Sequence, residues 1–586
     1  MKLYFLKNWR GITVIILAII FFVGTSFLNY KIFAFGENDF VKFNSPDENA
    51  NYIFTKLYAQ TGEFDIFEKY NLYAKDIMSP RSVRSDAGVL KPMSFLGMII
   101  IYGKIACALG YKIIPYITPF LASLGLIFYF LFIKKFFGRD IAFISTLLLI
   151  FFPVFIYYTA RSMFHNVPLI VFIIMGLYFG AEGSEDKKNE DDEPFFRWKT
   201  FFCFALSGIF FGLAIIARTS ELIWIAPMLF IIWIINFKKI VFFRLIIFLS
   251  FLFLAMLPAF YHNQALYGSP LFGGYPEMNR AISDVVENSA ALISSTAQGR
   301  LNSSWDQVIK IKNLIFYFGV HPLFSAKMVY YYFVKMFYWL FWPAVLGAII
   351  YLMKIHKWEK KHWSYIMSFL AVSFILSLYY GSWVFHDNPD PHQYTIGNSY
   401  TRYWLPIYLG ALPFVALAIA KTVSVSAKYI FKTDPPSLRF GVASKKIFIV
   451  ICQAVLISAI IFLGIRFVLV GSEEGLLYLP EKMAGAKLES QKVLELTPSN
   501  AVVITKYHDK FLFPERKVIV GGFEDVNLVI EYANLAKHIP VYYFNFTLPD
   551  EHMRWLSDKR LKENGLGIEK IEEISSDFTL YKIFSL

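Results

Sequence analysis

The chain has 586 residues, 56% of them hydrophobic, with 63 Phe and 36 Tyr. A soluble core of this length does not need so many apolar side chains, so the composition predicts a polytopic membrane protein. The net charge of +13 does not indicate nucleic-acid binding. Lys and Arg occur in short clusters between apolar runs, at residues 134–135, 238–239 and 445–446, which is typical of cytoplasmic loops. We therefore expect no nucleic-acid partner.

The apolar runs predict about eleven membrane-spanning helices. The first, at residues 11–33, follows a basic segment and shows no small-residue cleavage site, so we expect an uncleaved helix with a cytoplasmic N-terminus. The other ten are expected near residues 113–133, 140–158, 167–181, 200–217, 222–236, 241–258, 330–353, 364–382, 403–421 and 447–470. This pattern predicts a multi-pass protein of the cell membrane.

Residues 93–109 are apolar but short, and they contain Lys104. If this stretch spanned the membrane, every later basic cluster would face outward, so the charge bias favours a segment that lies along or re-enters the outer face. On that topology, residues 34–112, 259–329 and 383–402 form outer loops, and the C-terminus is extracytoplasmic.

The composition changes near residue 471, where charged residues return. Short β-type runs at residues 501–505, 517–520 and 541–546 alternate with helical patterns near 480–495, 525–537 and 550–564, which is typical of a small α/β domain. We therefore expect a helical transmembrane domain over residues 1–470, an extracytoplasmic α/β domain over residues 471–586, and membrane lipids among the partners of the protein.

An adjacent acidic pair, Asp47–Glu48, lies in the first outer loop, shortly after the first span. A carboxylate near hydrocarbon loses solvation, so it is usually retained there only where it is functional or paired with another group. The position of this pair therefore suggests chemistry on a lipid-borne substrate. The alternative is a helix start, because Ser45 and Pro46 precede the two acids and acids are favoured in a first turn.

Several motifs resemble those of the GT-C glycosyltransferases, in the same order and on the same predicted side. They are Asp-Glu at 47–48, Lys-Pro-Met-Ser-Phe-Leu at 91–96, Lys-Lys-Phe-Phe-Gly-Arg at 134–139, Ala-Arg-Ser-Met-Phe-His-Asn-Val-Pro at 160–168, Gly-Leu-Ala-Ile-Ile-Ala-Arg at 212–218, Asn-Gln-Ala-Leu-Tyr-Gly-Ser-Pro-Leu at 263–271 and Thr-Arg-Tyr-Trp-Leu-Pro at 401–406. The likeness covers most of residues 1–420. It is greatest to the protein O-mannosyltransferases and the lipid A aminoarabinose transferase.

The resemblance implies a membrane glycosyltransferase of GT-C fold. Such an enzyme transfers a sugar from a polyprenyl-phosphate-linked donor to a lipid, glycan or protein acceptor at the outer face, with inversion at the anomeric carbon. The resemblance implies that the acidic residue of the first outer loop is the catalytic group, and this residue corresponds to Asp47. Independently of the family, an attacking hydroxyl needs a positioned base, and desolvation makes a carboxylate more basic. Glu48 either acts beside Asp47 or faces water.

A phosphate leaving group needs cations rather than a general acid. Arg402, beside Tyr403 before an apolar span, is suited to bind such a phosphate with two hydrogen bonds, or else it is an interface anchor. Arg218 ends an apolar run, and the alternative for it is a pair with Glu221 at helical spacing. Arg161 is a weaker candidate for the same role.

Asn166 stands where related transferases often place a second acid. Asn brings no charge, so a metal ion that bridges two carboxylates is possible but not favoured, and we expect no resident metal. Asn166 and His262 are candidates for substrate contact. A rival metal site at residues 386, 387, 390 and 392 has suitable side chains but lacks the helical spacing of a hydrolytic zinc site.

Three other classes remain open. One is a non-enzymatic membrane scaffold whose outer domain binds a partner. A transporter or flippase also needs many spans, but it usually places ionisable groups near the middle of the membrane on repeated helices, and no repeat is visible here. An oligosaccharyl-type transferase is expected to need a divalent metal and a larger C-terminal domain that reads the acceptor sequence.

Overall fold

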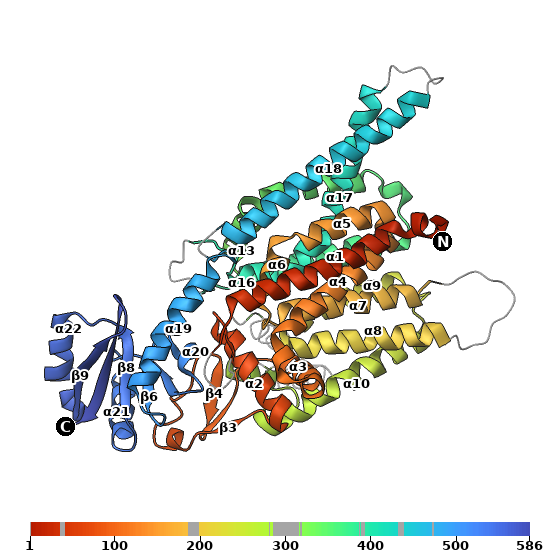
Figure 1. The fold of residues 1–586 in the computed structure, drawn as a ribbon. Coiled ribbons are helices and arrows are strands. Elements are labelled where there is room, and N and C mark those ends of the chain that lie inside the picture. Colours follow the sequence, from red (N-terminus) through yellow and green to blue (C-terminus); the bar gives the residue numbers. More distant parts are fainter. Residues whose placement is uncertain are drawn as a thin grey trace.

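The computed structural model describes residues 2–35, 41–185, 198–280, 282–284, 316, 319–385, 387, 393–431, 439–471 and 474–586. Figure 1 shows a bundle of long helices with a small α/β domain at one end. The helices of the bundle are α1 (Lys2–Ile32), α4 (Ile114–Phe137), α5 (Arg139–Ile150), α6 (Pro153–Arg161), α7 (Asn166–Gly183), α8 (Trp198–Ala217), α9 (Leu222–Ile235), α10 (Phe242–Tyr267), α13 (Pro322–Val329), α14 (Tyr338–Leu352), α15 (Lys360–Gly381), α17 (Leu405–Ile430) and α18 (Arg439–Val470).

In the part of the chain that the structure describes, eight helices are long and apolar enough to cross a membrane, and ten spans result if each of two bent helix pairs is one span. These ten correspond to ten of the eleven expected spans. The eleventh, expected near residues 222–236, is α9, which has 14 residues. With the short turn before it, α9 belongs to a shorter apolar helix over Thr219–Ile235. An odd number of crossings, which a C-terminal domain on the opposite side of the membrane from the N-terminus requires, includes this helix.

The two bent pairs differ from the straight helices that the sequence predicts. The pair α5 and α6 bends by 52°, where Pro153 begins α6; proline lacks the N–H of a continuing helix but suits a first turn. The segment expected as one span over residues 330–353 bends by 99° between residues 335 and 338. A π-helical turn at Tyr330–Lys335 precedes that bend.

The first expected outer loop folds into a compact unit beside the bundle. It contains β1 (Ala34–Phe35), β2 (Val41–Lys42), α2 (Pro46–Thr61), α3 (Leu96–Leu109) and an antiparallel sheet in the order β3-β5-β4, formed by β3 (Ile66–Phe67), β5 (Val89–Pro92) and β4 (Val83–Asp86). Helix α3 is the apolar stretch expected near 93–109. A Cβ on Gly97 would lie 2.2 Å from the backbone of Ile216, so this glycine lets α3 approach the end of α8 closely.

The C-terminal part is a five-stranded sheet with helices, in the order β7-β6-β8-β10-β9. Its elements are α19 (Leu479–Leu496), β6 (Val502–Thr505), α20 (Asp509–Leu512), β7 (Lys517–Val520), α21 (Val526–Ala536), β8 (Val541–Phe546), α22 (Asp550–Trp555), β9 (Leu566–Glu573) and β10 (Phe578–Ser585). The three expected strands are confirmed as β6, β7 and β8, and the first two pair in parallel. The structure therefore confirms the predicted fold class, an α-helical membrane protein with a small C-terminal α/β domain.

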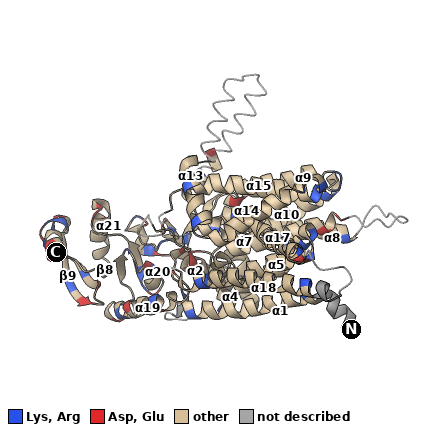
Figure 2. Cartoon of the chain, turned by 90° about the horizontal axis from the view of Figure 1, so that it is seen from above, with Lys and Arg blue, Asp and Glu red and all other residues tan. Residues whose placement is uncertain are grey.

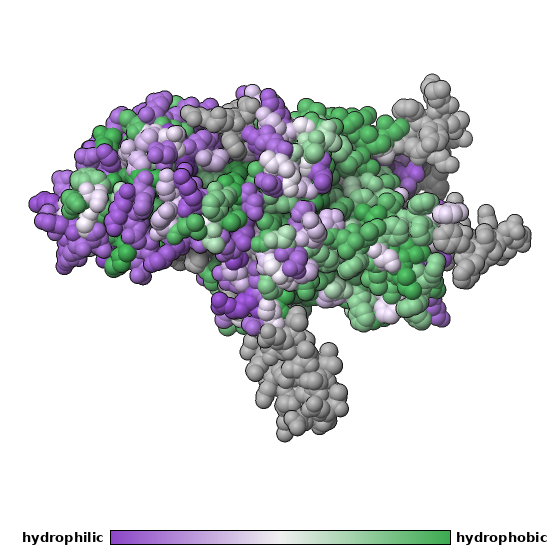
Figure 3. Space-filling view, turned by 90° about the horizontal axis from the view of Figure 1, so that it is seen from below, coloured by the Kyte–Doolittle hydropathy of each residue, from purple (hydrophilic) through white to green (hydrophobic). Residues whose placement is uncertain are grey.

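The surface separates into two regions. Figure 3 shows apolar side chains over much of the helical bundle and polar ones over the C-terminal domain. Lys135 and Lys239, from two of the predicted cytoplasmic clusters, line one cavity of about 320 Å³ together with Lys361. Figure 2 shows Lys and Arg near the ends of α8 and α9 that lie away from the C-terminal domain. These two predicted cytoplasmic clusters thus share one end of the bundle; below, the opposite end is called the domain end.

Candidate functional site

Asp47 lies at the domain end, in the first turn of α2. Ser45 is the N-cap and Pro46 follows it, and the backbone N–H of Ser45 donates to Glu48 Oε2 at 2.9 Å, as in a capping box. The Asp47 side chain remains 40% exposed, and its Oδ1 accepts a hydrogen bond from Ser82 Oγ at 2.6 Å. Asp47 is thus both a residue of a helix start and an accessible carboxylate, the two interpretations that the sequence left open.

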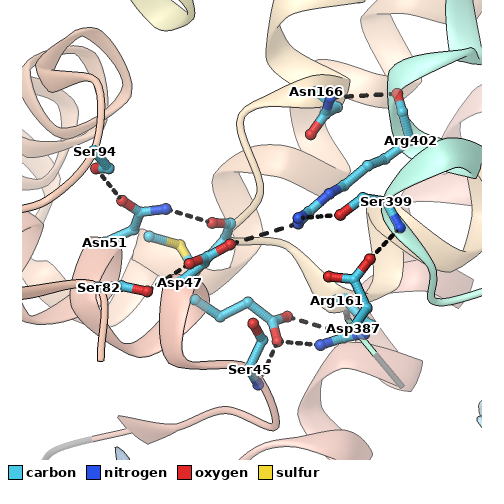
Figure 4. A network of polar contacts seen from close by, with 12 residues as sticks. Ser45, Asp47, Asn51, Ser82, Ser94, Arg161, Asn166, Asp387, Ser399 and Arg402 are labelled. Carbon is cyan, nitrogen blue, oxygen red and sulfur yellow. Dashed lines mark hydrogen bonds and ion pairs between the residues drawn. The ribbon is translucent and has the colours of Figure 1, made fainter. Parts of the chain in front are cut away.

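Arg402 faces this carboxylate from α16 (Ser399–Tyr403). Figure 4 shows the Arg402 guanidinium pointing toward the Asp47 carboxylate. Its Nη1 lies 3.6 Å from Asp47 Oδ2, too far for a good hydrogen bond. Nη2 donates to Ser399 Oγ at 2.8 Å, whereas the buried Nε makes no hydrogen bond to any residue that the structure describes. The guanidinium, whose side chain is 12% exposed, therefore has donors left for a ligand beside Asp47.

Arg218, directly after α8, is the second guanidinium of the site. Its Nε lies 2.7 Å from Glu221 Oε1, so the pair expected at helical spacing is present. The guanidinium carbon also lies 4.1 Å from the centre of the Tyr403 ring, and that of Arg402 lies 5.2 Å from the same ring. Tyr403 thus contacts two cations through its aromatic ring, which brings three of the predicted site residues together.

Glu48 and Arg161 form a buried ion pair next to Asp47. Arg161 Nη2 donates to Glu48 Oε2 at 2.6 Å, and both side chains are almost completely buried. Arg161 Nη1 also donates to the hydroxyl of Tyr157 at 2.9 Å. The donors of Arg161 are therefore occupied by protein groups, and the Glu48 carboxylate points to Arg161 rather than to solvent.

The two remaining candidates occupy different places. Asn166 Nδ2 donates to the backbone carbonyl of Arg402 at 3.3 Å, so Asn166 lies at the site and holds the segment of the arginine. The ring of His262 packs on Tyr58 and Phe64 in a separate aromatic cluster. The sequence predicted an outer loop from residue 259, which would place His262 at its beginning. Because α10 continues to Tyr267, His262 instead belongs to a helix.

Only one of the four residues of the rival metal site lies in the described part of the chain. Asp387 is within the described part, where its Oδ2 accepts from the backbone N–H of Ser399 at 2.7 Å. Residues 386, 390 and 392 of the rival metal site lie outside the described residues. Among the residues that are described, no three His, Cys, Asp or Glu side chains gather as metal ligands.

His165 is a site residue that sequence reasoning missed. It lies between α6 and α7, and its Nε2 is 3.3 Å from the carbonyl oxygen of Phe95. Burial, with the nearby Arg218 guanidinium, lowers the pKa of His165 to about 4. His165 is therefore a neutral hydrogen-bonding residue at neutral pH. It lies in the 160–168 motif, but a single histidine without a partner at a characteristic spacing gave no signal.

We expect His165 to make the folded protein acid-sensitive. Its pKa in the folded chain is below the value of about 6.5 in an unfolded chain, so the unfolded state binds more protons between these values. The stabilisation is present above about pH 6.5 and is lost as the pH falls towards 4. From pH 7 to pH 5 this amounts to roughly 2 kcal/mol.

The check is the unfolding midpoint of the wild type and of His165→Gln, each measured at pH 7 and pH 5. The wild-type midpoint should fall further than that of the variant. Equal falls in the two proteins would show that His165 does not titrate as the structure indicates.

Known proteins match this chain in fold but not in sequence. No model of a known protein family matches the chain, and no curated protein matches it. Among solved structures, the archaeal oligosaccharyltransferase AglB from Archaeoglobus fulgidus, in complex with an inhibitory peptide and a dolichol-phosphate, has a TM-score of 0.52 at 12% identity, and the match covers 95% of this chain and 71% of that chain.

ArnT from Cupriavidus metallidurans bound to undecaprenyl phosphate also has a TM-score of 0.52, at 11% identity, with 97% of each chain covered. The Archaeoglobus fulgidus oligosaccharyltransferase tethered with an acceptor peptide containing the NVT sequon has a TM-score of 0.51 at 12% identity, with 98% of this chain and 74% of that chain covered. At such identities the likeness shows the fold. The chain thus has the GT-C fold, as the sequence motifs predicted.

Proposed function

From the GT-C fold and the group at its domain end, we propose that the protein is a membrane glycosyltransferase. It transfers a sugar from a polyprenyl-phosphate-linked donor to an acceptor at the outer face of the cell membrane. The observation that carries the proposal is the accessible carboxylate of Asp47 beside the incompletely paired guanidinium of Arg402, 3.6 Å apart. Two proteins of the same fold have dolichol-phosphate and undecaprenyl phosphate bound, which supports the donor class.

The proposed topology follows from the fold and the charge pattern. The domain end is the outer face, because the basic clusters that line the cavity lie at the other end of the bundle and basic clusters remain in the cytoplasm. The N-terminus is then cytoplasmic, and the C-terminal domain is extracytoplasmic.

In the reaction, Asp47 is the general base. It accepts the proton of an acceptor hydroxyl while the hydroxyl oxygen forms a bond to the anomeric carbon of the donor sugar. The bond from that carbon to the phosphate oxygen breaks, and its electron pair leaves with the polyprenyl phosphate. A single displacement of this kind inverts the anomeric configuration. The Ser82 hydroxyl, which donates to Oδ1, orients the base.

Arg402 is the cation best placed to hold the phosphate. Its buried Nε has no hydrogen bond within the described part of the chain, and an unsatisfied buried donor costs about 1–3 kcal/mol. A phosphate oxygen would satisfy this donor with a charge-assisted bond. Arg218 is already paired with Glu221, so its contribution is mainly the positive field beside Tyr403.

Replacing Arg402 by Ala tests the donor site. Loss of a charge-assisted contact worth about 1.5–3 kcal/mol should weaken polyprenyl phosphate binding by roughly 10- to 150-fold. The matched control is Arg244→Ala, since Arg244 contacts the Lys239 carbonyl in the basic cluster at the opposite end. Competition binding with purified protein gives both affinities. Unchanged binding in Arg402→Ala would remove Arg402 from the donor site.

The same purified protein distinguishes the alternatives. A transporter would leave a labelled sugar attached to its lipid phosphate, whereas a transferase would release the lipid phosphate and move the label to an acceptor. An oligosaccharyl-type enzyme would need a divalent metal, so loss of transfer on chelation and its recovery with added metal would favour that class.

A further inference from the structure

The C-terminal domain contacts the short segments that carry the proposed base and the proposed phosphate ligand. Figure 1 shows α20 beside α2 and β4. The contacts are made by residues of α20, by the chain just after it, and by Glu474 in the connection from the bundle. They reach three places: the residue before Ser82, the residues before Ser45, and the segment before Ser399.

The first contact fixes the neighbour of Ser82. Asp509 of α20 is fully buried, and its carboxylate accepts from the backbone N–H of Arg81 at 2.9 Å and from the Nε of the same residue at 3.1 Å. Arg81 Nη2 makes a further contact with Oδ1. One carboxylate therefore holds both the main chain and the side chain of Arg81.

Ser82 needs such support, because its φ is +65°. This left-handed region is disfavoured for a residue with a Cβ atom and persists where the surroundings enforce it. In this conformation the Ser82 hydroxyl donates to Asp47 Oδ1 at 2.6 Å. The route from Asp509 to the proposed base thus passes through only two residues, Arg81 and Ser82.

The second contact fixes the entry of α2. Lys510 Nζ donates to the carbonyl oxygen of Asn44, the residue before the N-cap. Lys42 Nζ lies 2.6 Å from Glu515 Oε2, and both side chains are buried. These bonds attach the chain three and five residues before Asp47 to the C-terminal domain, directly ahead of the first turn of α2.

The third contact reaches the segment of Arg402. Glu474 Oε2 accepts from the backbone N–H of Gly397 at 2.9 Å, two residues before Ser399, whose hydroxyl accepts from Arg402. A Cβ at residue 397 would lie 2.2 Å from this carboxylate oxygen, so glycine permits the approach. The C-terminal part of the chain thus touches both sides of the gap between Asp47 and Arg402.

We propose that the C-terminal domain is a positioning clamp, which sets the separation of Asp47 and Arg402 through the Arg81–Asp509, Lys510–Asn44 and Glu474–Gly397 contacts. Arg81, Asp509 and Lys510 are positioning residues, because they act through Ser82 and the entry of α2. The proposal rests on the proposed function in taking Asp47 as the base. It assigns the domain a task in the chemical step, beyond covering the site.

The test compares two bonds in the same interface. Arg81→Gln removes the guanidinium bonds to Asp509 but keeps the backbone N–H. The matched control is Lys75→Gln, which removes the 2.6 Å ion pair between Lys75 and Glu531, a contact of the same loop with α21 instead of α20. Lys510→Met, which removes the bond to Asn44, serves if Arg81→Gln does not fold.

Positioning predicts a split between rate and binding. Small displacements of reacting groups lower rates by up to about 100-fold, so kcat of Arg81→Gln should fall about 10- to 100-fold while KM for the donor changes less than about 3-fold. Arg81→Lys should recover part of the rate, and Lys75→Gln should match the wild type. All variants are assayed below their unfolding midpoints.

Two results would overturn the clamp: an unchanged kcat in both Arg81→Gln and Lys510→Met, or an equal fall of kcat in Lys75→Gln. Failure of the proposed function is a different result, because the wild type would then transfer no sugar, or Asp47→Asn would keep the wild-type rate.

Discussion

Asp47→Asn is expected to lower sugar transfer by about 10²- to 10⁴-fold, the usual contribution of a general base. Asn has the shape of Asp and keeps an oxygen that can accept from Ser82, but it cannot take a proton from an acceptor hydroxyl. Because the change also removes a negative charge 3.6 Å from Arg402, donor binding should stay equal or become tighter. The measurement is the initial rate of transfer from polyprenyl-phosphate-linked sugars by purified protein.

The control is Asp140→Asn, the same chemical change at the start of α5. Asp140 pairs with Arg10 at 2.8 Å on an exposed surface, and surface pairs of this kind contribute little to stability. This variant should transfer sugar at the wild-type rate. If Asp47→Asn is correctly folded and equally active, Asp47 is not the base.

Glu48→Gln is expected to destabilise the protein by about 3–5 kcal/mol, because it leaves the buried Arg161 guanidinium without its counter-charge. The two side chains are 5% and 1% exposed and 2.6 Å apart. Gln retains an oxygen for the N–H of Ser45, so the substitution isolates the lost charge from the lost cap. The readout is the unfolding midpoint in detergent, which should fall by many degrees.

The double variant Glu48→Gln, Arg161→Met separates structure from catalysis. It removes both charges, so much of the lost stability should return. If instead Glu48→Gln unfolds like the wild type and is inactive, Glu48 acts in the reaction and its pair with Arg161 contributes little to the fold.

Hydropathy predicted most of the bundle, because a helix that crosses a membrane must be apolar over its length. Hydropathy does not predict bends within an apolar run. The apolar run continues through Phe151 and Phe152, where α5 and α6 meet at 52°, and a hydropathy average does not register that Pro153 begins a new helix there. In the C-terminal domain, β9 was missed because its second half, with Glu569, Lys570 and Glu572, lacks an apolar alternation.

The site residues that the sequence predicted are those whose position relative to the apolar runs was informative. Asp47 and Arg402 each lie at the border of an apolar run, which marks them as ionisable groups at a membrane boundary. The Arg218–Glu221 pair was visible as an alternative because its partners are three residues apart.

Contacts between distant residues gave no such signal. Glu48 and Arg161 are 113 residues apart, so nothing local showed that their charges compensate each other. Ser82 and Asp509 gain their positions from the folded loop and from the C-terminal domain. Their relation to Asp47 therefore required the structure.

The most direct measurement of the central claim is photo-crosslinking of the purified protein with a photoreactive polyprenyl phosphate, followed by mapping of the labelled peptides. The proposed donor site predicts saturable labelling of the segment around Arg402, competed by unlabelled polyprenyl phosphate and reduced in Arg402→Ala. Absence of saturable labelling, or labelling that Arg402→Ala leaves unchanged, would contradict a lipid-phosphate donor site beside Asp47.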